Sequence, residues 1–226
     1  MTPWVLLDSA PVPDDGGELR LLRRGTEYSI MAGAIELMNS RLSGSEEALA
    51  DLAFAKLKGV RAPTVLIGGL GMGFTLRAAL AALPAEARVV VAELVPAVVA
   101  WARGPLAEVF EGCLDDPRVS LEITDVAAAI EASEAGYDAI LLDVDNGPEG
   151  LTRRANDALY DEAGLARLHQ ALKPGGVLAV WSSGPNLRFT KGLRKSRLAA
   201  EEHRVPARKG GKGARHTIWL GVRPPH

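Results

Sequence analysis

The sequence predicts an α/β protein with a doubly wound, mostly parallel sheet that ends in an antiparallel hairpin. Short apolar, β-branched runs alternate with helical stretches from residue 64 to residue 181, a pattern typical of βαβ units. A glycine cluster follows the first of these runs, where a strand must turn sharply into a helix. Two further strand-like runs surround a glycine-rich tip near the end of the chain, which indicates a terminal hairpin.

Each strand expected in the alternating region is short and nearly all apolar, as strands covered on both faces are. The five strands are predicted at 64–67, 88–93, 119–123, 138–143 and 176–181. Helices are predicted between and after them at 74–83, 96–103, 126–132, 161–172 and 186–198, with a shorter turn at 106–110. The hairpin strands are predicted at 202–205 and 216–221. This order is the Rossmann-like sheet plan of class I methyltransferase-type proteins.

The first sixty residues do not follow the alternating pattern, so we expect an appendage at 1–60 and a Rossmann-like domain at 61–226. Two strand-like runs, 19–23 and 27–31, flank a short turn and predict a β-hairpin. A helix is predicted from Ser43 to about residue 58, because apolar residues recur along one side of it. The appendage is expected to act either as a lid on the glycine cluster or as a homodimer contact.

The glycine cluster predicts a site for a nucleoside cofactor. Gly69, Gly71 and Gly73 follow the first strand and leave room for a ligand to touch the backbone. Glu93 ends the next strand, twenty residues after Gly73, where a carboxylate accepts hydrogen bonds from both hydroxyls of a ribose. Glycines alone also suit a turn that binds nothing, and Glu93 favours the ligand-binding interpretation.

The spacing of the glycines indicates which nucleoside to expect. Dinucleotide folds favour G-x-G-x-x-G, and the third position of that pattern is Phe74 here. A bulky residue at this position disfavours NAD. The tighter G-x-G-x-G form suits a cofactor without phosphates, which predicts S-adenosylmethionine or its decarboxylated form.

Ligands of such sheets bind beyond the carboxyl ends of the strands, so the residues that end the third strand are further candidates. Thr124 and Asp125 follow that strand. The Asp125 carboxylate suits a hydrogen bond from an adenine amino group, and it equally suits the N-cap of the helix that starts at Val126. The two roles are compatible in one loop.

The fourth strand ends in the best candidate for the reacting site. Asp143 and Asp145 lie two residues apart at the expected rim of the crevice, and they repel each other unless a cation lies between them. A substrate amine or the cofactor's sulfonium is such a cation. We assign Asp145 to proton acceptance and Asp143 to holding substrate or cofactor. The alternative is a turn made of Asp, Asn, Gly and Pro that needs only turn chemistry.

Composition narrows the remaining functional classes. No apolar stretch approaches the roughly 20 residues of a membrane span, and the N-terminus lacks the pattern of a signal peptide, so we expect a cytoplasmic protein without a membrane partner. The only cysteine, Cys113, has no Cys or His at metal-ligand spacing, and we expect no metal. It is expected to be a small buried residue.

The charges are distributed unevenly around a net charge of −2. Residues 187–215 carry a balance of +8, which leaves −10 for the rest of the chain. This basic segment suits a solvated helix and hairpin tip, or a surface that binds nucleic acid or an acidic partner. Because no aromatic residues interleave the charges at 208–212, the solvated interpretation is favoured.

From 64 to 184 the chain resembles the spermidine synthase-like branch of the class I S-adenosylmethionine-dependent methyltransferase superfamily. The matching segments are the glycine cluster, Glu93, 124–125, 137–143, 147–148, 158–160 and 171–176. The resemblance implies that Glu93 binds the ribose, that Asp125 binds the adenine, and that the turn at 143–146 holds an acceptor amine. Two departures stand out, because Gly71 replaces an aspartate of the aminopropyltransferases and their Asp-x-x-Asp-Pro turn is shortened here.

Because of these departures, we expect a group transferase that uses S-adenosylmethionine to methylate a small amine or another nucleophile. Aminopropyl transfer from decarboxylated S-adenosylmethionine is the alternative. A second alternative is a non-catalytic or nucleic-acid-associated protein that retains the fold.

Overall fold

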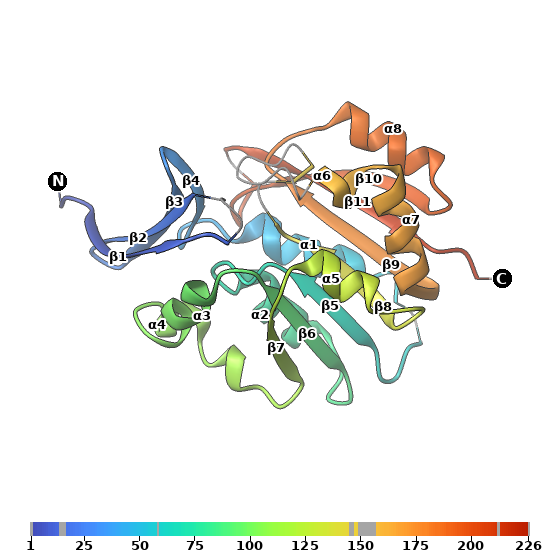
Figure 1. Ribbon diagram of the computed structural model, residues 1–226, viewed down its shortest axis with the longest axis horizontal. Coiled ribbons are helices and arrows are strands. Elements are labelled where there is room, and N and C mark those ends of the chain that lie inside the picture. The colour runs from blue at the N-terminus through green and yellow to red at the C-terminus, as the bar shows by residue number, and fades with distance from the viewer. Residues whose placement is uncertain are drawn as a thin grey trace.

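The computed structural model describes residues 2–13, 17–57, 59–144, 147–148, 157–211 and 213–225. Figure 1 shows two sheets, a small N-terminal one and a larger one covered by helices. The larger sheet has the strand order β10-β11-β9-β8-β5-β6-β7. Its parallel part, β5 to β9, is extended at one edge by the antiparallel pair β10 and β11. The predicted fold class is therefore confirmed.

The strands of the larger sheet lie close to the predicted positions. They are β5 (Thr64–Gly68), β6 (Arg88–Glu93), β7 (Val119–Ile123), β8 (Tyr137–Leu142), β9 (Leu172–Ser182), β10 (Ala199–Pro206) and β11 (Arg215–Val222). The largest difference is in β9, which starts four residues before the prediction. Leu172 already pairs with Tyr137, and the Gly175 amide donates to the Arg223 carbonyl, so residues 173–175, between the predicted helix and the predicted strand, are part of the strand.

Helices cover both faces of this sheet and form two hydrophobic layers. One layer contains α1 (Gly44–Phe54), α2 (Phe74–Ala82), α3 (Pro96–Arg103) and α4 (Ala107–Phe110), followed by a short 3-10 turn at Cys113–Asp115. The other contains α5 (Val126–Glu131), α6 (Asp157–Tyr160), α7 (Glu162–Ala171) and α8 (Leu187–Lys195). Alternate strand residues serve the two layers, as Ile67 and Leu66 do.

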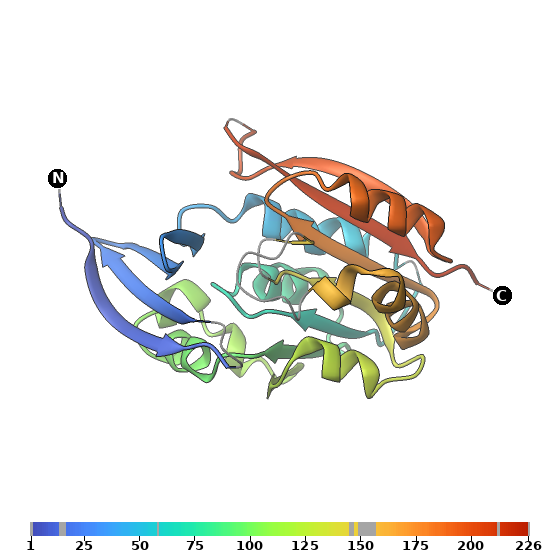
Figure 2. The same ribbon diagram turned by 45° about the horizontal axis from the view of Figure 1, so that its top comes forward.

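The N-terminal sheet has four strands, whereas the sequence predicts only two. Its order is β1 (Val5–Pro11), β2 (Glu18–Arg24), β3 (Glu27–Ala32) and β4 (Ile35–Asn39). Figure 2 shows this blue sheet beside the green helices α3 and α4. The indole Nε1 of Trp101 on α3 donates to the Asp8 carboxylate on β1 at 2.7 Å, which ties the two parts together.

Helix α1 packs against the larger sheet, although it lies in the segment that the sequence assigns to the appendage. It contacts β8, β9, β10 and β11 and runs beside α2. The Gly44 amide donates to the Ala207 carbonyl at the end of the terminal hairpin. A side chain at Gly44 would meet the backbone of Lys209, so the close approach of helix and hairpin requires glycine here. The helix ends at Phe54, earlier than predicted.

The turn from β5 to α2 depends on glycines in the left-handed region. Gly73 has φ +76° at the N-cap of α2, and a β-carbon there would lie 2.7 Å from the Phe110 ring. Gly112 has nearly the same φ, +74°, but a β-carbon there would meet nothing within 4 Å. An alanine would therefore strain the backbone at both positions, but it would clash with a neighbouring side chain only at position 73.

We predict that Gly73→Ala destabilises the protein more than Gly112→Ala. The backbone strain alone costs about 1 kcal/mol at each position, and Gly73→Ala adds an overpacking cost of about 1–3 kcal/mol. Urea denaturation of the two variants and the parent chain measures both effects. Equal losses of stability would contradict the packing of Phe110 on the glycine turn.

Candidate active site

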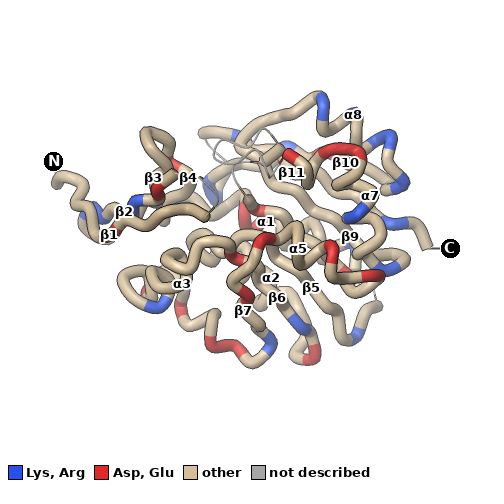
Figure 3. Tube along the Cα trace, in the orientation of Figure 1, with Lys and Arg blue, Asp and Glu red and all other residues tan. Residues whose placement is uncertain are grey.

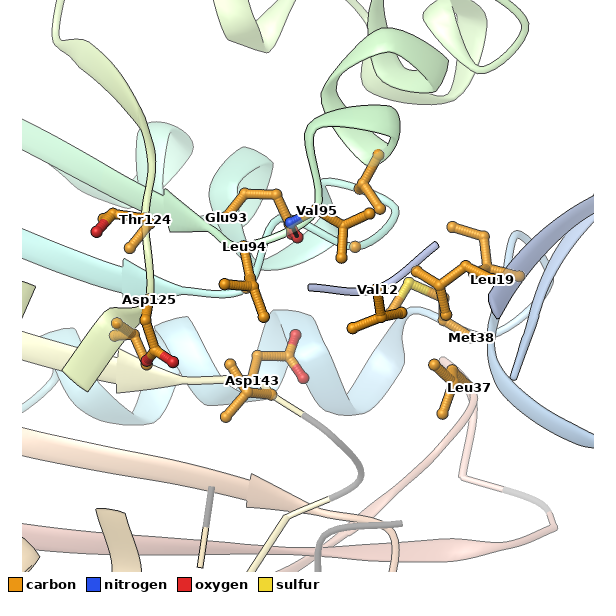
Figure 4. A pocket seen from close by; sticks show the side chains of 17 residues that line it. Val12, Leu19, Leu37, Met38, Glu93, Leu94, Val95, Thr124, Asp125 and Asp143 are labelled. Atoms are coloured by element: carbon orange, nitrogen blue, oxygen red, sulfur yellow. Dashed lines mark hydrogen bonds between the residues drawn. The ribbon is translucent and has the colours of Figure 1, made fainter. Parts of the chain in front are cut away.

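A cleft lies at the carboxyl ends of the central strands, under the N-terminal sheet. Its volume is about 120 Å³, and polar residues from the ends of β6, β7 and β8 line one side. Gly69 and Gly71 line it from the turn after β5. The other side is apolar and comes from the N-terminal sheet, with Val12, Leu19, Ile30, Leu37 and Met38. Figure 4 shows the Asp143 carboxylate directed into the cleft and the apolar residues on the far side.

Glu93 ends β6 and is buried at the floor of this cleft. One carboxylate oxygen accepts from the Leu70 amide at 2.9 Å and the other from the Val95 amide at 2.8 Å. Burial raises the pKa of Glu93, and the two backbone amides oppose that rise. The carboxylate thus joins the glycine turn to the loop after β6, in addition to lining the cleft.

Thr124 and Asp125 also line the cleft, from the loop after β7. The Asp125 carboxylate accepts from the Ala127 amide at 2.9 Å and so caps α5. The N-cap interpretation of Asp125 is therefore confirmed, and its role toward adenine stays a prediction.

Asp143 follows β8 and accepts a hydrogen bond from the Thr75 hydroxyl at 2.9 Å. Burial raises the pKa of its carboxyl group to about 6. Its backbone carbonyl lies so close to Gly69 that a β-carbon there would be 2.4 Å away. The glycine turn and the end of β8 are thus in direct contact.

A second, smaller cavity of about 50 Å³ adjoins the cleft. Leu37, Met38 and Asp143 line both spaces, so Asp143 lies where they meet. The second cavity also contains Glu46 from α1 and Trp181 from the end of β9, among apolar side chains from the glycine turn and α2. Burial, and then the charge of Asp143, raise the pKa of Glu46 to about 7.

Glu46 and Trp181 are site residues that the sequence analysis missed. Glu46 lies three, four and seven residues before Leu49, Ala50 and Ala53, which are the buried apolar residues of α1. A carboxylate on the buried face of a helix is the signal that would have found it. Trp181 reads as an ordinary apolar residue of a buried strand, and nothing in the sequence marks it.

Two predicted site residues, Gly73 and Asp145, remain. Gly73 packs on Phe110 and is not among the described residues that line either cavity. Asp145 lies outside the described residues, so its expected role as proton acceptor stays a prediction. Among the described residues, no group of three His, Cys, Asp or Glu side chains could hold a metal ion.

The charged side chains that line the two cavities are all acidic among the residues described. Glu93, Asp125, Asp143 and Glu46 line the two cavities, and no Lys or Arg does. The basic C-terminal segment lies elsewhere, on α8 and the terminal hairpin (Figure 3). Part of it is paired, since Lys209 bonds to Glu47.

Within the described ranges, none of the helices has the length and apolar character needed to span a bilayer.

Comparison with known proteins assigns the chain to a family. The spermine/spermidine synthase domain family matches residues 43–192, which is well over half of the chain. The polyamine aminopropyltransferase 2 of Pseudomonas aeruginosa is 38% identical over 120 residues, which cover 51% of this chain and 32% of that protein. The polyamine aminopropyltransferase of Korarchaeum cryptofilum is 31% identical over 144 residues, which cover 62% of this chain and 43% of that protein. The match thus spans less than half the length of these relatives.

Solved structures support the same fold. A spermidine synthase from Thermotoga maritima superimposes with a TM-score of 0.77 at 17% identity, covering 98% of this chain and 73% of that one. A probable spermidine synthase from Corynebacterium glutamicum gives a TM-score of 0.66 at 16% identity, covering 96% and 79%.

The expectation of methyl transfer is wrong, because the matching family and these relatives are spermidine synthases and aminopropyltransferases. That expectation depended on Gly71 and the shortened turn, and the family match overrules both. Helix α1, which the sequence analysis placed in an appendage, lies inside the family match. On the extent of that match, the chain belongs to the spermine/spermidine synthase domain family.

Proposed function

We propose that this protein transfers the aminopropyl group of decarboxylated S-adenosylmethionine to an amine. The observation that carries the proposal is the pair of adjoining cavities with Asp143 at their junction, in a chain of this family. The larger cleft, with Glu93, Thr124 and Asp125, suits the donor nucleoside. The smaller cavity, with its carboxylates and apolar wall, suits an alkyl amine.

The charges of the site favour the decarboxylated donor over S-adenosylmethionine itself. The carboxylate of S-adenosylmethionine would need a cation or several amide donors, and the described lining residues include no Lys or Arg. Arg41, a cation just after β4, bonds to Glu36 at 3.0 Å and lies over the Trp4 ring. A donor that carries only positive charge matches the acidic cleft.

The reaction is an in-line displacement that the protein promotes chiefly by alignment. The lone pair of the acceptor nitrogen forms a bond to the aminopropyl carbon next to sulfur, the carbon–sulfur bond breaks, and its electron pair neutralises the sulfonium. An amine is protonated in water and has no lone pair for attack, so a proton must first leave it. Asp143 lines both cavities, and its raised pKa suits it to accept that proton.

A transfer assay with a panel of diamines and polyamines tests the proposal. We expect a thioether nucleoside and an elongated amine from decarboxylated S-adenosylmethionine, and no methylated amine from S-adenosylmethionine. Asp143→Asn should lower kcat by about 100-fold or more, since one proton acceptor is lost. Methyl transfer, or no transfer to any amine, would refute the proposal.

Binding of the donor depends on Glu93 in this arrangement. We predict that Glu93→Gln weakens binding of decarboxylated S-adenosylmethionine by about 10- to 100-fold, because an amide replaces a charged acceptor for the ribose hydroxyls. Calorimetry measures the affinity, and circular dichroism checks the fold, because Glu93 also holds the Leu70 and Val95 amides. Equal affinity of parent and variant would contradict the ribose role.

The stability of the protein should depend on the Asp143 carboxyl group. A carboxyl with a raised pKa in the folded state stabilises that state when protonated, and this stability is lost as the pH rises through about 6. Asp143→Asn should therefore raise the free energy of unfolding, relative to the parent, by about 1–3 kcal/mol more at neutral pH than in acid. Urea denaturation of the parent and the variant from acid to neutral pH measures this difference in stability. Asp115→Asn, which changes an exposed carboxylate, is the control.

A further inference from the structure

A chain of hydrogen bonds leads from the smaller cavity to a histidine on the terminal hairpin. The Ser45 hydroxyl oxygen lies 2.6 Å from the Glu46 carboxylate and 2.8 Å from the His216 Nδ1. Ser45 is fully buried. A hydroxyl carries one proton, so it donates to one of these neighbours while it accepts from the other. Ser45 can therefore pass a proton between Glu46 and His216.

Glu46, at one end of this series of hydrogen bonds, lines the smaller cavity, which is the proposed acceptor space. Glu46 and Asp143 line the same cavity, and each carboxyl has a raised pKa, so the pair can hold a proton near neutral pH. Trp181 lines that cavity as well. Its side chain is 6% exposed, and its indole Nε1 has no hydrogen-bond partner among the described residues. A buried donor without a partner is costly, which points to a ligand in this space.

The second end of the chain can accept a proton and release it. His216 is half-buried near the start of β11, and burial lowers its pKa, so the ring is mostly neutral at pH 7. The Trp181 ring stands edge-on to it, with centroids 4.9 Å apart and an interplanar angle of 82°. The wall of the cavity thus fixes the orientation of the imidazole.

We propose that Glu46, Ser45 and His216 form a relay that removes the proton of the acceptor amine, an inference that rests on the proposed function. Asp143 and Glu46 together hold the ammonium group. The ammonium gives its proton to this carboxylate pair and keeps the lone pair that attacks the aminopropyl carbon. The proton passes from Glu46 to the Ser45 oxygen as the Ser45 proton moves to His216 Nδ1.

The relay then resets without any other reactant. The imidazolium loses one proton to water, and proton exchange with water leaves the neutral ring protonated on Nε2, so that Nδ1 is free to accept from Ser45 again. Glu46 is then ionised and faces the next ammonium, and this is the starting arrangement. Each turnover releases one proton, as the conversion of an ammonium and a sulfonium into a secondary ammonium and a thioether requires.

Other charged groups near Glu46 have different partners. Glu47 on α1 raises the pKa of Glu46 slightly, and it bonds to Lys209 from the hairpin and to Ser43. Arg77 of α2 pairs with Glu111. Asp143, just after β8, is the charge that acts most strongly on Glu46. These contacts make Ser43 a matched control, because it also bonds a glutamate at the start of α1 but outside the cavity.

Kinetics of paired variants test the relay. Ser45→Ala and His216→Ala should each lower kcat by about 10- to 100-fold near pH 7, with the KM for the amine within about twofold of the parent. The defect should shrink as the pH rises toward about 9, where water and hydroxide take the proton directly. Free imidazole should restore activity to His216→Ala. The controls Ser43→Ala and His203→Ala should show none of these effects.

Nuclear magnetic resonance of the imidazole nitrogens gives a second readout. We expect neutral His216 to carry its proton on Nε2 near pH 7, because Nδ1 must be free to accept from Ser45, and we expect a shift of its titration in Glu46→Gln. Unchanged kcat in Ser45→Ala and His216→Ala, or a lowered kcat that neither imidazole nor pH restores, would overturn the relay and leave aminopropyl transfer standing. A parent chain that transfers nothing would overturn both proposals.

Discussion

The geometry of the site depends on one buried carboxylate. Glu93 accepts hydrogen bonds from Leu70 in the turn after β5 and from Val95 in the loop after β6. Buried charge is stable only when such donors surround it, so the two loops cannot separate without leaving the carboxylate unpaired. The turn that contains Gly69 and Gly71 is therefore held at the edge of the sheet. Asp143 is fixed in turn, because its carbonyl packs against Gly69.

At this edge of the sheet, acidic side chains lie among apolar ones. The proposed reaction brings together two cations, a sulfonium and an ammonium, which repel each other in a medium of low dielectric constant. Asp143 and Glu46 offset that repulsion, and their raised pKa values express chiefly the cost of burying them and, for Glu46, also the charge of Asp143. The same property allows one of them to take a proton when the ammonium must lose it. The burial of these two carboxyl groups thus underlies both the binding of the cations and the removal of the proton from the ammonium.

The sequence predicts the features that depend on local pattern. Apolar runs and glycines locate β5 to β8 and the turn at Gly69, and the placement of Glu93 and Asp125 at strand ends follows from that order. The strand β1 was missed because six of its seven residues are exposed without alternation. The end of α7 was placed correctly, but the start of β9 was not, since its pairing with Tyr137 is a tertiary contact. Strand propensity depends on the local sequence and does not reveal such a contact.

The smaller cavity was beyond sequence reasoning for a different reason: its polar residues come from distant parts of the chain. Ser45 and His216 are 171 residues apart and meet because α1 packs beside the terminal hairpin. That packing depends on Gly44, whose amide bonds to Ala207, and on the Lys209 pair with Glu47. The hairpin therefore has a second role besides forming the edge of the sheet, because it places His216 beside α1, the helix that contains Glu46. A change that loosens the hairpin from α1 would disturb the smaller cavity while leaving Glu93 and the larger cleft in place.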